Sequence, residues 1–243
     1  MAAGKGTRLK SKRAKVLHES GGRPLLRHVI DAAAQVVPPR DILVVVGHQA
    51  EAVQSAVGAT GVRFVLQAKQ RGTGHALQCA ETETRDYGEL IVLSGDVPLL
   101  RSETILALRD FHLRQRAAMT ILTAAPANPF GYGRVLRRKP DSPEVQAIIE
   151  QKALEAGQES LREINSGIYA FQREKLYSHI GRLRSKNAHK ELYLTDMAQI
   201  LSKAGDRVVA EAAPNPVEVL GAHTIAEMMD LDREMRLATA RRL

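Results

Sequence analysis

Residues 2–15 read Ala-Ala-Gly-Lys-Gly-Thr-Arg-Leu-Lys-Ser-Lys-Arg-Ala-Lys, a glycine-containing turn that runs into a series of basic side chains. Gly4 and Gly6 carry no Cβ, so their backbone N–H groups can lie side by side and form a concave anion site. The surrounding lysines and arginines favour a polyanion, because charge-assisted hydrogen bonds are roughly twice as strong as neutral ones. This stretch predicts a cradle for the phosphates of a nucleoside triphosphate.

Two well-known phosphate motifs do not match the same stretch. A Walker A loop needs a further glycine ahead of its Gly-Lys pair, and no glycine precedes Gly4. The dinucleotide fingerprint Gly-x-Gly-x-x-Gly needs its third glycine where Leu9 stands. On these residues alone, a solvated basic turn remains an equal alternative.

Composition narrows the class of protein. The chain has 243 residues, of which 44% are hydrophobic and 26% charged, enough for one large α/β domain or a domain with an added lobe. A net charge of +8 favours anionic partners, but only 4% of residues are aromatic and none is Trp, which argues against a nucleic-acid binder.

Cys79 is the only cysteine, which excludes an intrachain disulfide and a cysteine-based zinc site. No apolar run approaches the ~20 residues of a membrane span and no signal peptide is recognisable, so we expect a cytoplasmic protein without membrane partners.

Apolar spacing in the first half alternates between strand and helix. It predicts a helix at 50–57, further helices that start near residues 24, 72 and 102, and strands at 42–46, 62–66 and 90–93. This order predicts an α/β fold, a Rossmann-like mostly parallel sheet with crossover helices. No strand precedes the glycine turn, although phosphate turns usually follow one, so either the start is truncated or another segment fills that place.

The second half is richer in short strands and turns. The pattern predicts a smaller β-rich lobe with strands at 119–123, 135–136, 145–150 and 168–171, followed by helices at 174–183 and 194–204 and a strand at 208–212. Thr224 and Glu227 form a Thr-x-x-Glu capping box, which predicts the start of a last, charged helix.

Candidate catalytic residues lie at predicted strand ends, where open parallel sheets bind their ligands. Asp96 follows an apolar strand and can hold Mg²⁺, which usually takes one or two carboxylates together with substrate phosphates. The alternative is a turn aspartate that hydrogen-bonds its own backbone. Arg8 and Lys15 can stabilise the charge on a phosphoryl group in transfer, unless they are simply solvated.

Polar residues beside short strands of the second half form a further candidate group. Gly133, Glu150 and Asn165 can bind sugar hydroxyls or an amide, and they can equally be ordinary turn residues.

Together these segments resemble the sugar-phosphate nucleotidyltransferases, most closely the bacterial N-acetylglucosamine-1-phosphate uridylyltransferases. Ala2-Ala3 and the Gly-Thr-Gly-His-Ala turn point to that branch. The match covers nearly the whole chain in the family's order. It rests on residues 2–8, 15–18, 67–68, 72–76, 95–99, 131–134, 149–150, 164–167 and 193–196.

The resemblance implies a reaction and a set of roles. It implies transfer of UMP from UTP to N-acetylglucosamine 1-phosphate by in-line displacement, with Mg²⁺ as cofactor and pyrophosphate as product. The implied catalytic residues are Arg8, Lys15 and Asp96. The implied nucleotide contacts are Ala2, Ala3, Gly4, Lys15, Gln67, Gly72, Thr73, Ser94, Gly95 and Asp96; the implied sugar contacts are Gly133, Glu150 and Asn165; and the implied metal ligands are Asp96 and His223.

Two departures from the family pattern carry expectations of their own. The family places an asparagine as second metal ligand after Glu-Val-x-Gly, whereas residues 218–223 read Glu-Val-Leu-Gly-Ala-His. Imidazole is a poorer Mg²⁺ ligand than a carbonyl oxygen, so His223 binds weakly, acts through water, or accepts another metal.

The second departure is length, because the family protein continues into a left-handed β-helix acetyltransferase domain. We expect a nucleotidyltransferase domain over residues 1–223 and a helix at 224–243 that resembles the connection to that domain. The chain is then expected to be a monomer without acetyltransferase activity, and a trimer is expected only when the missing domain is present. The absence of a first strand is expected to lower the stability of the fold.

Two rival functions stay open at this point. One is a nucleotidyltransferase for another base or hexose 1-phosphate. The other is a non-catalytic binder of nucleotides or nucleic acid that keeps the fold.

Overall fold

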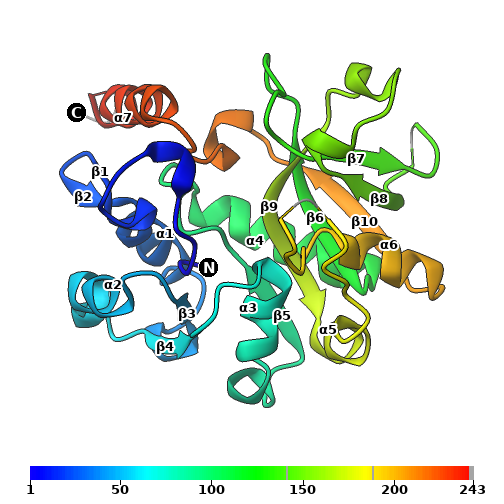
Figure 1. The fold of residues 1–243 in the computed structure, drawn as a ribbon, viewed down its shortest axis with the longest axis horizontal. Helices are drawn as coiled ribbons and strands as arrows, with labels where there is room; N and C mark the ends of the chain where they lie inside the picture. The colour runs from blue at the N-terminus through cyan, green and yellow to red at the C-terminus, as the bar shows by residue number, and fades with distance from the viewer. Residues whose placement is uncertain (141, 188, 241–243) are drawn as a thin grey trace. The chain divides into compact units, whose positions relative to one another are not determined.

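A computed structural model describes residues 1–140, 142–187 and 189–240 (Figure 1). The chain divides into two compact units. Unit 1 comprises residues 1–70, 94–105 and those from Leu220 onward, and unit 2 comprises residues 71–93 and 106–219. The predicted division at residue 223 stays a prediction.

Unit 1 is built around a short parallel pair of strands. β3 (Leu43–Val46) pairs with β4 (Arg63–Leu66), and α2 (Ala50–Val57) connects them. Helix α2 has the bounds that the apolar spacing predicts. It packs with α1 (Leu25–Ala33) and the strands around one buried apolar cluster, so this part is a βαβ arrangement of the predicted kind.

Residues 1–3 occupy the place of the strand that the sequence lacks. The Ala2 N–H donates to the Val45 carbonyl at 2.8 Å, and the His48 N–H donates to the Ala3 carbonyl at 3.1 Å, so this segment runs parallel to β3. On the other side, the Met1 carbonyl accepts a hydrogen bond of 3.0 Å from the Gly95 N–H. The glycine turn therefore does follow an extended, paired segment.

Unit 2 contains a six-stranded mixed sheet with the order β10-β6-β9-β7-β8, and β5 also pairs with β9. Its strands are β5 (Glu89–Val92), β6 (Met119–Ala124), β7 (Arg134–Arg137), β8 (Val145–Ile149), β9 (Ile164–Gln172) and β10 (Val208–Ala212). Strands β6 and β10 are parallel, whereas β9 is antiparallel to β5, β6 and β7. The α/β class is confirmed, but this sheet is mixed, whereas the helix-strand rhythm predicted mostly parallel pairing.

Strand β9 organises the sheet of unit 2. It is longer than the predicted 168–171 because it pairs with three neighbours, and a register shift at Leu122/Thr123 lets it stay paired with β6 along its length. Ile164, Ile168 and Phe171 are fully buried along it. Such long-range pairing carries no local periodic signal.

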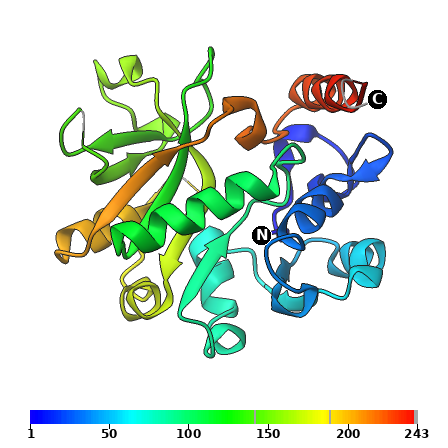
Figure 2. The same cartoon turned by 180° about the vertical axis from the view of Figure 1, so that it is seen from behind.

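The helices of unit 2 are α3 (Thr73–Cys79), α5 (Arg173–Ile180), α6 (Asp196–Lys203) and the larger part of α4 (Ser102–Gln115), which begins in unit 1. Figure 2 shows this part of α4 lying across the sheet. His112 on α4 connects this helix to two strands of the sheet, with Nδ1 2.7 Å from the Thr120 hydroxyl on β6 and Nε2 3.0 Å from a Glu89 carboxylate oxygen on β5. Burial lowers the pKa of His112, although Glu89 opposes the shift. None of the helices among the described residues combines the length and the apolar character that crossing a membrane requires.

Helix α7 (Ile225–Ala240) starts at the predicted capping box. The Thr224 N–H donates to Glu227 Oε2 at 2.8 Å, and the Glu227 N–H donates to Thr224 Oγ1 at 3.2 Å. Leu231 is buried against Leu25, and Asp232 accepts a 2.7 Å hydrogen bond from the Gly21 N–H in the turn between β1 (Glu19–Ser20) and β2 (Arg23–Pro24). Helix α7 is therefore an integral part of unit 1.

We expect Thr224→Ala to lower the free energy of unfolding by about 1 kcal/mol, because the Glu227 N–H loses its partner at the helix start. Urea unfolding followed by circular dichroism measures the change. Thr239→Ala is the control, because its hydroxyl donates only to the Met235 carbonyl on the same helix; it should shift stability by less than about 0.5 kcal/mol. Equal stability of the Thr224 variant and the wild type would contradict the capping role.

Candidate active site

The centre of the candidate site is a contact between three side chains of unit 1 that lie far apart in the sequence. The Lys15 ammonium contacts Asp96 Oδ2 and lies 2.8 Å from His223 Nδ1. Asp96 Oδ2 and His223 Nδ1 are 3.8 Å apart. All three side chains are 20% exposed or less, so the charges interact in a largely desolvated setting.

Burial and the neighbouring charges set the protonation of this cluster. Burial alone would raise the pKa of Asp96, but the Lys15 ammonium and His223 hold it below its usual range. Burial, followed by the Lys15 charge, lowers the pKa of His223 to about 4. At neutral pH His223 is therefore an uncharged imidazole that accepts the Lys15 hydrogen bond at Nδ1, while Asp96 is ionised.

The backbone around the cluster is tied together by further hydrogen bonds. The Ala222 N–H donates to the Asp96 carbonyl at 3.1 Å, and the His223 N–H donates to Glu227 Oε2 at 2.8 Å. A Cβ at Gly221 would lie only 3.1 Å from both Asp96 Oδ2 and His223 Cε1. The capping glutamate of α7 and the glycine therefore help to position both side chains.

The glycine turn packs directly on the lysine of this cluster. Gly6 has a positive φ of 61°, and a Cβ there would lie 2.6 Å from Lys15 Cβ, so only glycine permits the approach. Gly4 is exposed, with open space on its Cβ side. Arg8 reaches the same cluster, its guanidinium 3.5 Å from His223 Nδ1. The three predicted catalytic residues of the chain thus share one unit and one site.

Several predicted nucleotide residues build the frame of this site. Ala2 and Ala3 are buried and pair with β3, so the Ala2 N–H is already engaged. Position 95 requires glycine, because a Cβ there would lie 2.9 Å from the Met1 carbonyl oxygen. Ser94 precedes Gly95 in the same segment. Gln67 is 3% exposed at the end of β4, and its carbonyl accepts a 2.8 Å hydrogen bond from the Gln70 amide.

Gly72 and Thr73 belong to unit 2, where they start α3. Gly72 has φ of 100°, and a Cβ on it would lie 2.6 Å from the Leu192 carbonyl oxygen. The Thr73 hydroxyl accepts a 2.9 Å hydrogen bond from the Leu194 N–H, and the Gly74 N–H donates to the Leu192 carbonyl at 2.8 Å. This turn is held in place by the segment at 192–194.

The predicted sugar residues also lie in unit 2, on β9 and beside β7 and β8. The Asn165 N–H donates to the Gly133 carbonyl at 2.9 Å, so these two residues are neighbours. The Asn165 amide donates to the Tyr169 hydroxyl at 2.9 Å, and burial raises the pKa of that phenol. Glu150 accepts a 2.9 Å hydrogen bond from the Thr195 hydroxyl.

Sequence reasoning assigned no role to Tyr169 and Thr195, which orient Asn165 and Glu150. Thr195 lies in the 193–196 segment that carries part of the resemblance, so a signal for it was present. Tyr169 lies within the predicted strand at 168–171, where it reads as a core residue.

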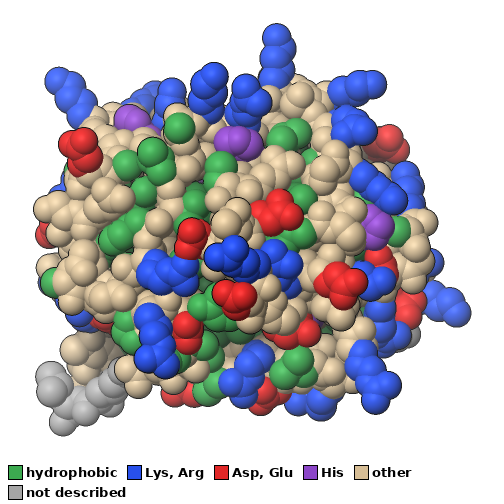
Figure 3. Space-filling model, turned by 90° about the horizontal axis from the view of Figure 1, so that it is seen from below, with side chains coloured by type: hydrophobic (Ala, Val, Ile, Leu, Met, Phe, Trp, Pro, Cys, Tyr) green, Lys and Arg blue, Asp and Glu red, His purple; other side chains and the backbone are tan. Residues whose placement is uncertain are grey.

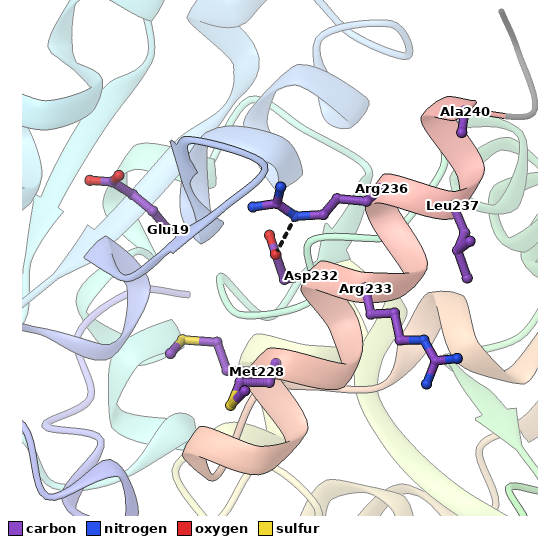
Figure 4. Close-up of a pocket in the computed structure, with 8 residues that line it drawn as sticks. Glu19, Met228, Asp232, Arg233, Arg236, Leu237 and Ala240 are labelled. Atoms are coloured by element: carbon purple, nitrogen blue, oxygen red, sulfur yellow. Dashed lines mark hydrogen bonds and ion pairs between the residues drawn. The ribbon is translucent and has the colours of Figure 1, made fainter.

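A separate cavity of about 540 Å³ lies along α7. Figure 4 shows its lining, in which Arg236 forms an ion pair of 2.7 Å with Asp232 across the helix surface. Met228 and Leu237 contribute apolar area, and Glu19 lies on the opposite side. None of the predicted site residues lines this cavity.

Comparison with known proteins identifies a domain family and full-length relatives. Residues 1–164 match the model of the MobA-like NTP transferase domain. The "Bifunctional protein GlmU" of Koribacter versatilis is 51% identical to the chain; the alignment covers 100% of the chain and 52% of that protein. The protein of the same name from Solibacter usitatus is 43% identical, and its alignment covers 97% of the chain and 50% of that protein. The chain therefore spans about half the length of these curated relatives.

Solved structures with similar folds have low sequence identity. A putative glucose-1-phosphate thymidylyltransferase from Bacillus anthracis superimposes with a TM-score of 0.73 at 21% identity, covering 97% of this chain and 93% of that one. A CMP:2-keto-3-deoxy-manno-octonic acid synthetase gives a TM-score of 0.66 at 20% identity, covering 94% and 95%. These neighbours establish the nucleotide-sugar transferase type of fold.

We expect Gly72→Ala to destabilise the protein by about 1–3 kcal/mol from the strained φ alone, with a further cost from the clash at the Leu192 carbonyl. Urea unfolding measures the loss. Gly88→Ala is the matched control in the same unit, because it has no positive φ and no atom within 4 Å of its Cβ position; its effect should stay below about 0.5 kcal/mol. Equal losses in both variants would contradict the assigned role of the Gly72 conformation.

Proposed function

The chain belongs to the MobA-like NTP transferase family, and we propose that it transfers UMP from UTP to N-acetylglucosamine 1-phosphate and releases pyrophosphate. The observation that carries the proposal is the buried Lys15–Asp96 contact beside the glycine turn. The choice of base and sugar rests on the resemblance of the sequence motifs. It is supported by the relatives named bifunctional protein GlmU, whose name states no substrate.

The reaction follows from the charges that the site gathers. A phosphate oxygen of the sugar phosphate attacks the α-phosphorus of UTP, and the bond to the leaving pyrophosphate breaks, so no covalent enzyme intermediate is needed. Lys15 and Arg8 bind phosphate oxygens and stabilise the negative charge of the transition state, with the N–H groups of the glycine turn as further donors. Holding the two substrates in line supplies the remaining part of the acceleration.

Magnesium is the cofactor that the resemblance implies, and the donor set fits it only in part. Asp96 is a suitable single carboxylate, since Mg²⁺ usually takes one or two carboxylates and completes its shell with phosphates and water. His223 does not suit it, because Mg²⁺ prefers oxygen ligands. Among the described residues no group of three or more His, Cys, Asp or Glu side chains is arranged to hold a metal ion. No step of the reaction is therefore assigned to magnesium.

Recognition groups for the two substrates are proposed in each unit separately. In unit 1 the Gln67 amide offers a donor and an acceptor that match the edge of uracil. In unit 2 Gly72 and Thr73 offer backbone and hydroxyl groups for a nucleotide. Glu150 and Asn165 offer a carboxylate and an amide for sugar hydroxyls and the N-acetyl group, and Gly133 lies beside Asn165. UTP and the sugar phosphate are the proposed partners.

A nucleic-acid partner is not proposed. On the face shown in Figure 3, acidic side chains lie among the basic ones, so the net positive charge is not gathered there into one patch. The rival that one observation favours is a nucleotide binder without turnover, because His223 replaces the amide expected at that position.

Release of pyrophosphate tests the proposal. We expect turnover with UTP and N-acetylglucosamine 1-phosphate, and at least about 10-fold lower kcat/KM with the other triphosphates, with glucosamine 1-phosphate, or with glucose 1-phosphate, because buried polar groups would be left unpaired. Higher activity with another base or sugar would transfer the assignment to that substrate. Tight UTP binding without turnover on any pair would establish the rival binder.

Asp96→Asn should lower turnover by about 100-fold or more while the fold is retained, because the variant removes the charge that holds Lys15 and a cation. Steady-state pyrophosphate release measures the loss, and circular dichroism checks the fold. Asp86→Asn is the control, since that carboxylate is 88% exposed and lies outside the site. Unchanged turnover in the Asp96 variant would remove Asp96 from the mechanism.

A further inference from the structure

At the candidate site of unit 1, an imidazole nitrogen lies where the resemblance leads us to expect an amide oxygen. His223 directs Nδ1 toward Asp96 Oδ2, at 3.8 Å. His223 thus lies 2.8 Å from the Lys15 ammonium, which binds phosphate oxygens in the proposed function, and the inference rests on that function.

The Lys15 ammonium marks where a cation is attracted. It contacts Asp96 Oδ2, it lies 2.8 Å from His223 Nδ1, and those two atoms are themselves separated by 3.8 Å. The carboxylate and the imidazole thus direct lone pairs at one common point. That point combines one oxygen and one nitrogen donor from the protein.

We propose that this point binds a first-row transition-metal dication, of which Mn²⁺ is the probe, in preference to Mg²⁺, with Asp96 Oδ2 and His223 Nδ1 as ligands. Mg²⁺ is bound by oxygen atoms in nearly ideal octahedral geometry, whereas imidazole binds the later divalent metals more tightly. Mn²⁺ accepts both donor types and, like Mg²⁺, binds phosphates. Because two cations cannot share the point, the metal ion replaces the Lys15 ammonium there.

Hydrogen bonds fix the main chain at both proposed ligands without any help from a metal ion. Glu227 accepts the His223 N–H at 2.8 Å, and the Asp96 carbonyl accepts the Ala222 N–H at 3.1 Å. Gly221 leaves the limited space that lets both side chains approach, since a Cβ would lie 3.1 Å from atoms of each. The two ligands are therefore positioned before an ion arrives, which is the arrangement that favours a selective site.

Electron paramagnetic resonance of bound Mn²⁺ tests the ligand directly, without reference to turnover. Spin-echo modulation should show a ¹⁴N coupling from the imidazole in the wild type, with Mn²⁺ alone or with Mn²⁺ and UTP. The coupling should disappear in His223→Asn, and the concentration of Mg²⁺ that displaces half of the Mn²⁺ should fall by about tenfold or more. His189→Asn, an exposed histidine of unit 2, should behave as the wild type.

Absence of a nitrogen coupling from the wild type under both conditions would overturn the proposal. A coupling that persists in His223→Asn would overturn it as well, because the nitrogen would then come from another residue. Lys15→Met supplies a second measurement that does not depend on the folding of the His223 variant. Removal of the competing ammonium should tighten Mn²⁺ binding by about tenfold, and an unchanged affinity would show that the metal and Lys15 do not share one point.

The test of the metal ligand and the test of the proposed reaction can fail independently of each other. A nitrogen coupling without pyrophosphate release on any substrate pair would support the metal site and refute the reaction. Pyrophosphate release with Mg²⁺ at full rate, and no nitrogen coupling, would support the reaction and refute this ligand set.

Discussion

The buried contact between the Lys15 ammonium and Asp96 is the interaction on which the candidate site depends. It joins the segment after the glycine turn to the segment after β5, and His223 adds a third segment from just before α7. A charge buried without a partner would be costly, so Lys15 and Asp96 each require the other. Unit 1 is assembled from the three stretches of chain that supply them.

Glycines make this contact possible at the points where backbone must come close to other atoms. Gly6 lies against Lys15, Gly95 lies against the Met1 carbonyl, and Gly221 lies between Asp96 and His223. In each case a Cβ would meet another atom at 3.1 Å or less. These residues shape the site through the space that they leave, whereas Lys15, Asp96 and His223 act through their charges and lone pairs.

Helix α7 links the stability of unit 1 to the chemistry of the site. Glu227 caps the helix through the Thr224 N–H and accepts the His223 N–H with the same oxygen atom. Farther along, Asp232 holds the turn between β1 and β2, and Leu231 is buried. A helix that the sequence pattern marks only as charged and capped therefore also fixes the backbone of His223 at the candidate site.

The sequence by itself determined features that arise among neighbouring residues. The helix at 50–57, the strand at 208–212 and the Thr224–Glu227 capping box follow from local spacing and local hydrogen bonds, and the motif segments led to the right family. Only the tertiary structure decided that residues 1–3 pair with β3, that β9 runs antiparallel to three strands, and that Lys15 Nζ lies between Asp96 and His223. The physical reason is that strand pairing and buried charge contacts join residues distant in the chain, and no periodic pattern records which partners will meet.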